Sequence, residues 1–108
     1  MHQTLQHRED GAVATIRLHR PERKNSLNAR MRSELEELLR DVAQKTWIRA
    51  VVVAGSDEIF CAGADIGEMG GPASAESSYR HAREFQVLFE QVESLPQPVI
   101  AAVSGYAL

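Results

Sequence analysis

The sequence predicts an α/β domain in which strands and helices alternate along the chain. Two apolar runs, Arg49–Gly55 and Val99–Ser104, are typical of strands that are buried, and each follows a segment with helical periodicity. Buried strands separated by helices favour a layered α/β domain with crossover connections. The predicted element order is β-β-α-β-loop-α-β.

Composition limits the kind of protein this is. The 108 residues suffice for one domain, which at this size buries roughly 65% of its unfolded surface. A net charge of −3 gives no electrostatic reason to expect nucleic acid or an anionic membrane as partner. A single cysteine excludes an internal disulfide, and no apolar run approaches the roughly 20 residues of a membrane span. We therefore expect a soluble cytoplasmic protein.

The first elements are predicted to form a hairpin. Thr4–Glu9 is a weak strand candidate, Asp10–Gly11 is a hairpin turn signal, and Ala12–His19 alternates between two faces. One face of this second strand carries Val13, Thr15 and Arg17, and the other carries Ala14, Ile16 and Leu18.

A polar segment and an amphipathic helix come next. Pro21 is expected to keep Arg20–Leu27 free of regular structure, and Asn28 can cap the N-terminus of the helix that follows. The apolar side chains of this helix recur at helical spacing, and they are Met31, Leu35, Leu38, Leu39 and Val42.

The segment Ile59–Met69 is predicted to organise the functional site. It follows a buried strand, is rich in small residues, and contains Asp65 and Glu68 at the spacing of a capping box that opens a short helix. Such a loop can leave backbone N–H groups free to bind an anion or a developing negative charge. A small side chain at Ala64 would keep its own amide accessible. From composition alone, a tight turn whose small side chains serve packing is the simpler interpretation.

A second helix and a second strand complete the chain. From Ala75 onwards a helical stripe comprises Tyr79, Ala82, Phe85, Leu88, Phe89, Val92 and Leu95. Pro96 and Pro98 end this helix, Val99–Ser104 forms the second buried strand, and Gly105 begins a turn. The chain stops at Leu108 without a polar tail, from which we expect that the fold continues beyond it.

Three motifs together resemble one family. They are Leu18–Pro21 followed by Asn25–Asn28, then Phe60–Ile66, and finally Pro98–Leu108. In this order they resemble the enoyl-CoA hydratase/isomerase (crotonase) family, and they cover nearly the whole chain. The resemblance implies a fold of repeated β-β-α units wound into a spiral. Residues 1–108 would be the N-terminal part of a single crotonase-like domain, truncated before the second half of its core.

The resemblance also implies a ligand and its contacts. Family members bind acyl-CoA thioesters, usually as trimers or dimers of trimers, with no cofactor apart from the coenzyme A of the substrate. The backbone N–H that matches Ala64 would donate to the thioester carbonyl and stabilise an enolate-like oxyanion. The positions that match the family's CoA-contacting loops are Lys24, Ser26, Ala62, Ala64, Asp65 and Ile66.

The chain departs from the family pattern at its end. The second oxyanion donor follows the position that matches Leu108, and the glutamates that handle water come later still. We therefore expect half an oxyanion hole here and no hydration by these residues alone. The most common family activity, addition of water to a trans-2-enoyl-CoA, is the predicted function of the complete protein. Alternatives are an isomerase or another crotonase-type reaction, a non-catalytic binding or assembly protein, and an unrelated α/β domain.

Other reactive residues have simpler interpretations. Cys61 is expected to be a small buried side chain, because no basic neighbour in the sequence is placed to lower its thiol pKa. The four histidines share no metal-ligand spacing, so no metal site is predicted. His81 falls in a segment that lines the acyl pocket in some relatives, which leaves a catalytic role open.

Overall fold

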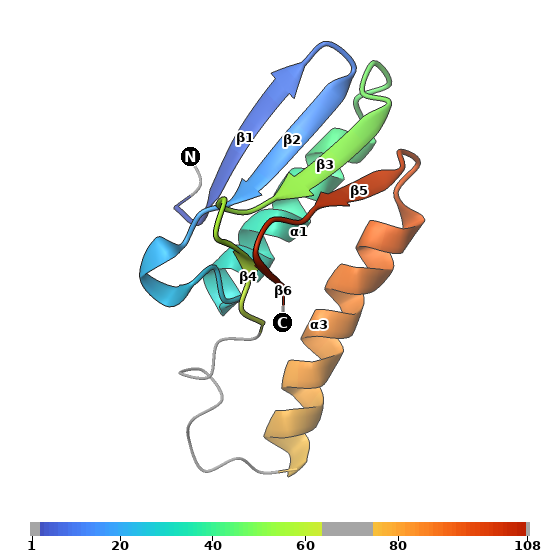
Figure 1. The fold of residues 1–108 in the computed structure, drawn as a ribbon. Coiled ribbons are helices and arrows are strands. Elements are labelled where there is room, and N and C mark those ends of the chain that lie inside the picture. The colour runs from blue at the N-terminus through green and yellow to red at the C-terminus, as the bar shows by residue number, and fades with distance from the viewer. Residues whose placement is uncertain (1–2, 64–74, 108) are drawn as a thin grey trace.

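A computed structural model describes residues 3–63 and 75–107, and it confirms the predicted α/β class. A four-stranded sheet has the order β1-β2-β3-β5, and a second sheet pairs β4 with β6 (Figure 1). The strands are β1 (Leu5–Asp10), β2 (Val13–Leu18), β3 (Ala50–Ala54), β4 (Ile59–Cys61), β5 (Val99–Ala102) and β6 (Tyr106–Ala107). The helices are the 3₁₀ helix η1 (Pro21–Arg23) and the α-helices α1 (Ala29–Ala43) and α3 (Ala75–Ser94).

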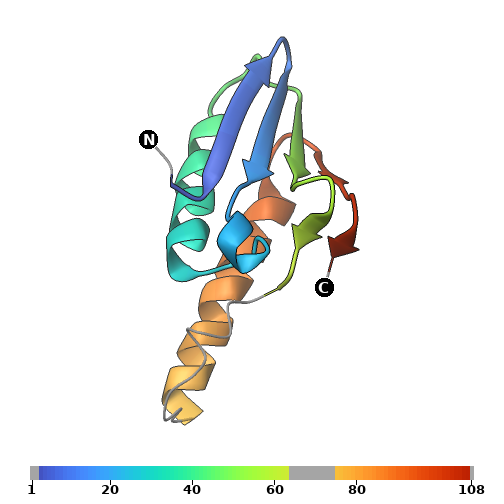
Figure 2. The ribbon, with the colours of Figure 1, turned by 60° about the vertical axis from the view of Figure 1, so that its left-hand side comes forward.

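The main sheet is built around the predicted hairpin and crossovers. β1 pairs antiparallel with β2 through a turn in which Gly11 has φ 62°, a value that glycine adopts without steric cost. β2 pairs parallel with β3, and β3 pairs parallel with β5. The crossover α1 lies against one face of this sheet, with α3 beside it (Figure 2).

The core lies between β2, β3 and α1, as the periodicity indicates. Of the two predicted faces of β2, the one with Ala14, Ile16 and Leu18 is buried, and so is the whole predicted stripe of α1. Asn28 caps α1 as expected, because its side-chain oxygen accepts a hydrogen bond of 2.8 Å from the backbone N–H of Met31.

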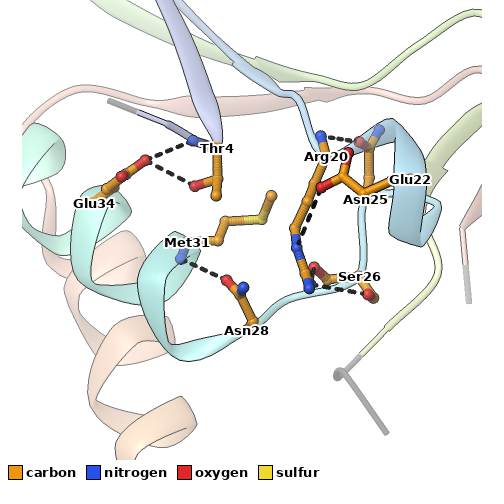
Figure 3. Close-up of polar contacts among 8 residues, drawn as sticks. All are labelled: Thr4, Arg20, Glu22, Asn25, Ser26, Asn28, Met31 and Glu34. Atoms are coloured by element: carbon orange, nitrogen blue, oxygen red, sulfur yellow. Dashed lines mark hydrogen bonds and ion pairs between the residues drawn. The ribbon is translucent and has the colours of Figure 1, made fainter. Parts of the chain in front are cut away.

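A buried carboxylate joins α1 to the start of β1. Glu34 accepts hydrogen bonds from the backbone N–H and the hydroxyl of Thr4, at 2.9 and 2.8 Å (Figure 3). Both residues are buried, and pairing offsets the cost of removing their polar groups from water. This contact fixes the first strand against the helix.

Three expectations about elements are corrected. Arg20–Leu27 does contain regular structure, since Pro21 begins η1; a proline is compatible with a first helical position because its missing N–H is not needed there. β4 lies inside the segment that the sequence suggested was a loop, and β6 follows Gly105 where only a turn was expected. Both strands are very short, and they depend on each other rather than on local pattern.

The second apolar run does form a strand, but it is not buried. Ile100 is 53% exposed, and Val103, the residue after β5, is 54% exposed; β5 is the edge strand of the main sheet within the described residues. An apolar run indicates what a strand tends to bury, and not whether a neighbour covers it. The stripe on α3 is likewise only partly covered: Leu88 is buried, whereas Tyr79 and Phe89 are exposed.

Two further points concern the limits of the described chain. The predicted capping box at Asp65 and Glu68 lies outside the described residues. Among residues 3–63 and 75–107, neither long helix combines the length and apolar character needed to cross a membrane.

Candidate functional site

The parallel pairing of β4 with β6 brings two distant segments to one edge. Ile59 is the partner of Tyr106, and Cys61 is the partner of Ala107. Parallel strands end at the same edge of a sheet, so the chain leaving Cys61 and the chain leaving Ala107 start side by side (Figure 1). The first of these continues towards Ala64, the predicted oxyanion donor, which itself lies outside the described residues.

Gly105 makes this pairing possible. It has φ +70°, and a Cβ atom built on it would lie 1.7 Å from the carbonyl oxygen of Glu58. The next residue, Tyr106, donates its backbone N–H to that same oxygen at 3.1 Å. Any side chain at position 105 would therefore push β6 away from β4.

The loop after β2 is fastened to the other side of β4. The backbone N–H of Ala62 donates to the carbonyl of Lys24 at 3.1 Å, and the N–H of Leu27 donates to the carbonyl of Gly63 at 2.7 Å. These two bonds hold the predicted CoA-contacting loop against the start of the predicted donor loop. Two segments that the sequence predicts to touch the same ligand are thus adjacent in the structure.

Asn25 lies at the centre of this arrangement, and sequence reasoning did not assign it a role. Its side chain is buried, and its Oδ1 atom accepts a hydrogen bond of 2.8 Å from the N–H of Arg20 (Figure 3). Its Nδ2 atom donates to the carbonyls of Ile59 and Phe60 at 3.2 and 3.3 Å. The backbone of Asn25 has φ 58°, in the left-handed region where asparagine is enriched. A polar residue of this type within a tight turn was the available signal, but its partners lie far along the chain.

Arg20 fixes the second half of the loop. Its Nη1 atom donates to the carbonyl oxygen of Ser26 at 2.8 Å and contacts the Ser26 hydroxyl oxygen at 3.2 Å. Its Nε atom lies 4.0 Å from the carboxylate of Glu22, a residue of η1 (Figure 3). Ser26 is a predicted CoA-contacting residue, and its hydroxyl already has a partner within the loop.

The remaining predicted site residues differ in their surroundings. Lys24 is exposed and has φ 54°, and it lines a cavity of about 430 Å³ between the loop after β2 and the turn before β4. Ala62 is half-buried, and its amide is bonded to Lys24 as described above. The residues that line this cavity are Arg17, Leu18, His19, Pro21, Lys24, Asn25, Ser56, Asp57, Glu58 and Ile59. Ala64, Asp65 and Ile66 lie outside the described residues.

Cys61 is a small buried side chain, as predicted. It is 8% exposed, and the N–H of Gly63 lies 3.4 Å from its sulfur. Its position is that of a packed core side chain. Among residues 3–63 and 75–107, no group of three or more histidine, cysteine or acidic side chains is arranged to hold a metal ion.

A larger cavity, of about 650 Å³, lies between α1 and α3. Arg32 contributes to its wall and forms a 2.7 Å ion pair with Glu84, while its guanidinium group lies 5.2 Å from the ring centre of Phe85. The described CoA-contact candidates Lys24, Ser26 and Ala62 are not among its lining residues. The larger cavity and the predicted CoA contacts therefore lie in different parts of the described structure.

Comparison with solved structures defines the class of the fold. An enoyl-CoA hydratase/carnithine racemase from Magnetospirillum magneticum superposes with a TM-score of 0.89 at 34% identity, covering 97% of this chain and 40% of that one. An enoyl-CoA hydratase from Bacillus anthracis superposes with a TM-score of 0.88 at 33% identity, covering 95% of this chain and 40% of that one. The fold is crotonase-like, which confirms the predicted fold class.

Sequence comparison identifies the family. The enoyl-CoA hydratase/isomerase family model matches residues 8–108, and the chain belongs to this family. A putative enoyl-CoA hydratase from Thermus thermophilus is 39% identical over 102 residues, which are 93% of this chain and 40% of that protein. A 1,2-epoxyphenylacetyl-CoA isomerase from Escherichia coli is 38% identical over 107 residues, which are 95% of this chain and 40% of that protein. The chain thus spans about 40% of the length of these relatives.

Proposed function

We propose that the complete protein is an enzyme that binds acyl-CoA thioesters and adds water to a trans-2-enoyl-CoA. The observation that carries this proposal is the parallel pairing of β4 with β6, which starts two loops from one edge. A thioester oxygen placed at that edge would be within reach of amides from both loops. Family membership and the names of the relatives support the substrate class.

In the proposed mechanism the Ala64 amide donates to the thioester oxygen as the enolate develops. A donor of this kind typically contributes about 3–4 kcal/mol of transition-state stabilisation, because it is oriented before charge appears. The second donor and the glutamates that handle water would follow Leu108. We therefore infer that residues 1–108 alone bind the substrate without turning it over.

The proposed contacts with coenzyme A come from two segments, the loop Arg20–Leu27 and the segment that follows β4, which we call the fastened loops. Lys24 supplies an exposed ammonium group for a phosphate, and the backbone around Ala62, Asp65 and Ile66 contacts the adenine and pantetheine parts. Ser26 contributes through its place in the loop, because its hydroxyl contacts Arg20. No cofactor is required beyond the coenzyme A of the substrate.

The wider setting is also a proposal. We place the complete protein among cytoplasmic lyases of fatty acid metabolism, assembled as a trimer or a dimer of trimers and forming one crotonase-like domain of which residues 1–108 are the N-terminal part. A second candidate reaction is isomerisation. It is favoured by the isomerase from Escherichia coli, whose identity to this chain is 38%, nearly equal to the best hydratase match reported above.

Thermal unfolding with a trans-2-enoyl-CoA tests the binding step on the 108-residue chain. A ligand that binds only the folded state stabilises it by about 2.7 kcal/mol at 100 times its Kd, so Tm should rise with concentration. The same acyl group on N-acetylcysteamine, which lacks the nucleotide, is the matched control and should shift Tm far less. An absence of any shift with CoA thioesters up to millimolar concentration would refute the inference that residues 1–108 bind the substrate.

The donor itself is tested in the complete protein. Ala64→Pro removes the amide hydrogen and should lower kcat by roughly 10²–10³-fold, the usual effect of losing one oxyanion donor. Ala64→Gly keeps the amide and serves as the control. Equal turnover by the proline variant and the wild type would contradict the assignment.

A further inference from the structure

We propose that Asn25 is a positioning residue of the acyl-CoA site: its carboxamide sets the direction in which β4 enters the predicted donor loop. The inference rests on the proposed function, since it concerns how that same site is held. Neither the motif analysis nor the family match assigns this role to Asn25.

The carboxamide is fully used, and all its partners are backbone groups. Its oxygen accepts from Arg20, and its nitrogen donates to Ile59 and Phe60, at distances between 2.8 and 3.3 Å. The residue is 3% exposed, so water does not replace these bonds. Leaving such groups unpaired in a buried position costs roughly 1–3 kcal/mol each.

The two carbonyls that Asn25 binds belong to consecutive residues. In a regular strand consecutive carbonyls point to opposite sides, and one side chain cannot reach both. β4 is irregular at this point, because the register with β6 shifts between Ile59 and Cys61. A local irregularity of this kind re-aims a strand and is frequent next to active sites. Asn25 binds the carbonyls at the irregular position.

The consequence reaches the predicted donor through a short chain of bonds. After Phe60, the N–H of Ala62 donates to the carbonyl of Lys24, and the carbonyl of Gly63 accepts from the N–H of Leu27. The chain is therefore bonded to the same loop at residues 59 and 60 and again at residues 62 and 63. Gly63 is the residue directly before Ala64. These bonds fix the described residues that lead into position 64, and fixing the approach to a donor before the ligand arrives reduces the reorganisation needed at the transition state.

Two substitutions separate the carboxamide from the backbone conformation. Asn25→Gly keeps the left-handed backbone at no steric cost but removes all three side-chain hydrogen bonds. Asn25→Asp keeps the shape, but its ionised form places an acceptor against the carbonyl oxygens of Ile59 and Phe60. When protonated, the same carboxyl has an O–H that can donate to one of them.

The aspartate variant therefore carries a pH signature. The burial and the carbonyl neighbours of residue 25 raise the folded-state pKa of the new carboxyl above its unfolded value of about 3.9. Its stabilising contact is present below that unfolded pKa and is lost as pH rises through the folded pKa. The glycine variant has no such group and should show no corresponding change with pH.

The test is amide hydrogen exchange by NMR on the 108-residue chain, corrected for intrinsic rates, at Leu27 and Ala62. Asn25→Gly should accelerate exchange at both amides by about tenfold or more at every pH, the effect of roughly 1.4 kcal/mol in local opening. At pH 8, Asn25→Asp should show the same fast exchange at these two amides as Asn25→Gly. As pH falls towards 4, the two amides of Asn25→Asp should regain protection. Amides of β2, such as that of Ile16, serve as the internal reference.

Each other outcome contradicts the proposal. Unchanged protection in Asn25→Gly, or protection in Asn25→Asp that does not depend on pH, would show that the carboxamide does not hold β4. If Asn25→Gly does not fold, the recovery of structure by Asn25→Asp on acidification remains the test, and failure to recover overturns the assignment.

A second readout distinguishes a positioning role from a purely structural one. The Kd for a trans-2-enoyl-CoA should increase about tenfold in Asn25→Gly, and the Kd of Asn25→Asp should improve again at low pH. Equal binding by wild type and Asn25→Gly would contradict positioning. If the wild type binds no CoA thioester, the proposed function fails, whereas the exchange results still decide whether Asn25 holds β4.

Discussion

The two sides of β4 are held in different ways. On one side, the loop Arg20–Leu27 contributes backbone and buried side-chain hydrogen bonds, several of them through Asn25. On the other side, β6 is joined by short parallel pairing, and its Tyr106 is 67% exposed. The neighbouring β5 presents Ile100 to solvent, and Val103, the residue that follows β5, is also exposed.

The difference shows which part of the site is self-sufficient. On the first side, the buried carboxamide of Asn25 forms its hydrogen bonds within this chain. This side therefore needs no other protein segment to satisfy that group. The second side exposes apolar side chains, and exposed apolar patches are typical of surfaces that bind another protein segment or a ligand. Within the described residues, the candidate site thus has one side fixed by polar contacts and one side fixed mainly by a close approach at Gly105.

The largest expected effect contrasts the core with the exposed strand. Ile16→Ala should reduce the free energy of unfolding by about 2–5 kcal/mol, because Ile16 is 0% exposed and its removal leaves a cavity. Ile100→Ala removes the same atoms from a side chain that is 53% exposed and should cost less than about 1 kcal/mol. Urea unfolding measures both. Equal losses would mean that β5 is covered in solution.

A smaller effect is expected at the approach of β6 to β4. Gly105→Ala combines a left-handed backbone with a clash against the Glu58 carbonyl, and should destabilise the chain by roughly 1–3 kcal/mol. Gly11→Ala is the matched control: its φ is +62°, but no atom lies within 4 Å of the added Cβ. Thermal unfolding should rank Gly105→Ala as the more severe change, with faster exchange of the Tyr106 amide. The reverse order would argue against the β4–β6 pairing.

The helix cap next to the fastened loop should contribute about 1 kcal/mol. Asn28→Ala removes the acceptor of the Met31 N–H, whereas Asn28→Asp retains it. We expect denaturant unfolding to show a loss of about 0.5–2 kcal/mol for alanine and little loss for aspartate. Similar losses for both would indicate that the cap is not formed in solution.

The smallest effect concerns a surface ion pair far from the site. The Lys45 ammonium, 2.5 Å from Glu9, lowers the pKa of Glu9 by hydrogen bonding, and Glu9 in turn raises the pKa of Lys45. The contribution of Glu9 is therefore present above its unfolded pKa and lost as pH falls through its lower folded pKa. The contribution of Lys45 is present below its unfolded pKa and lost as pH rises through its higher folded pKa.

Glu9→Gln should remove the part of this dependence that comes from the Glu9–Lys45 pair, and leave the contribution of Asp41, which lies 3.3 Å from the Lys45 ammonium. The difference in unfolding free energy between wild type and variant should be small at neutral pH, as for exposed ion pairs in general, and should shrink at both pH extremes. A difference that grows on acidification would contradict the pairing.

The sequence predicted the elements whose pattern is local. The hairpin around Gly11, the buried stripe of α1 and the cap at Asn28 are all confirmed, because turn chemistry, periodicity and capping act within a few residues. The three family motifs were also sufficient to predict the family, and the family model confirms that prediction. Ala64 as an oxyanion donor stays a prediction.

The sequence did not predict features that depend on distant partners. β4 and β6 have three and two residues, and neither length carries a recognisable alternation. The role of Asn25 depends on carbonyls 34 and 35 residues away, which no local pattern reveals. The exposure of β5 depends on what lies beside it, and this is a property of the sheet rather than of the apolar run.

The most direct test of the account is the location of the ligand. Titrating a trans-2-enoyl-CoA into the isotope-labelled 108-residue chain should shift the NMR amide signals of Lys24, Ala62 and Gly63, and leave those of the turn at Gly11 unchanged. Shifts centred instead on the cavity between α1 and α3, around Arg32, would contradict the assignment of the site to the fastened loops.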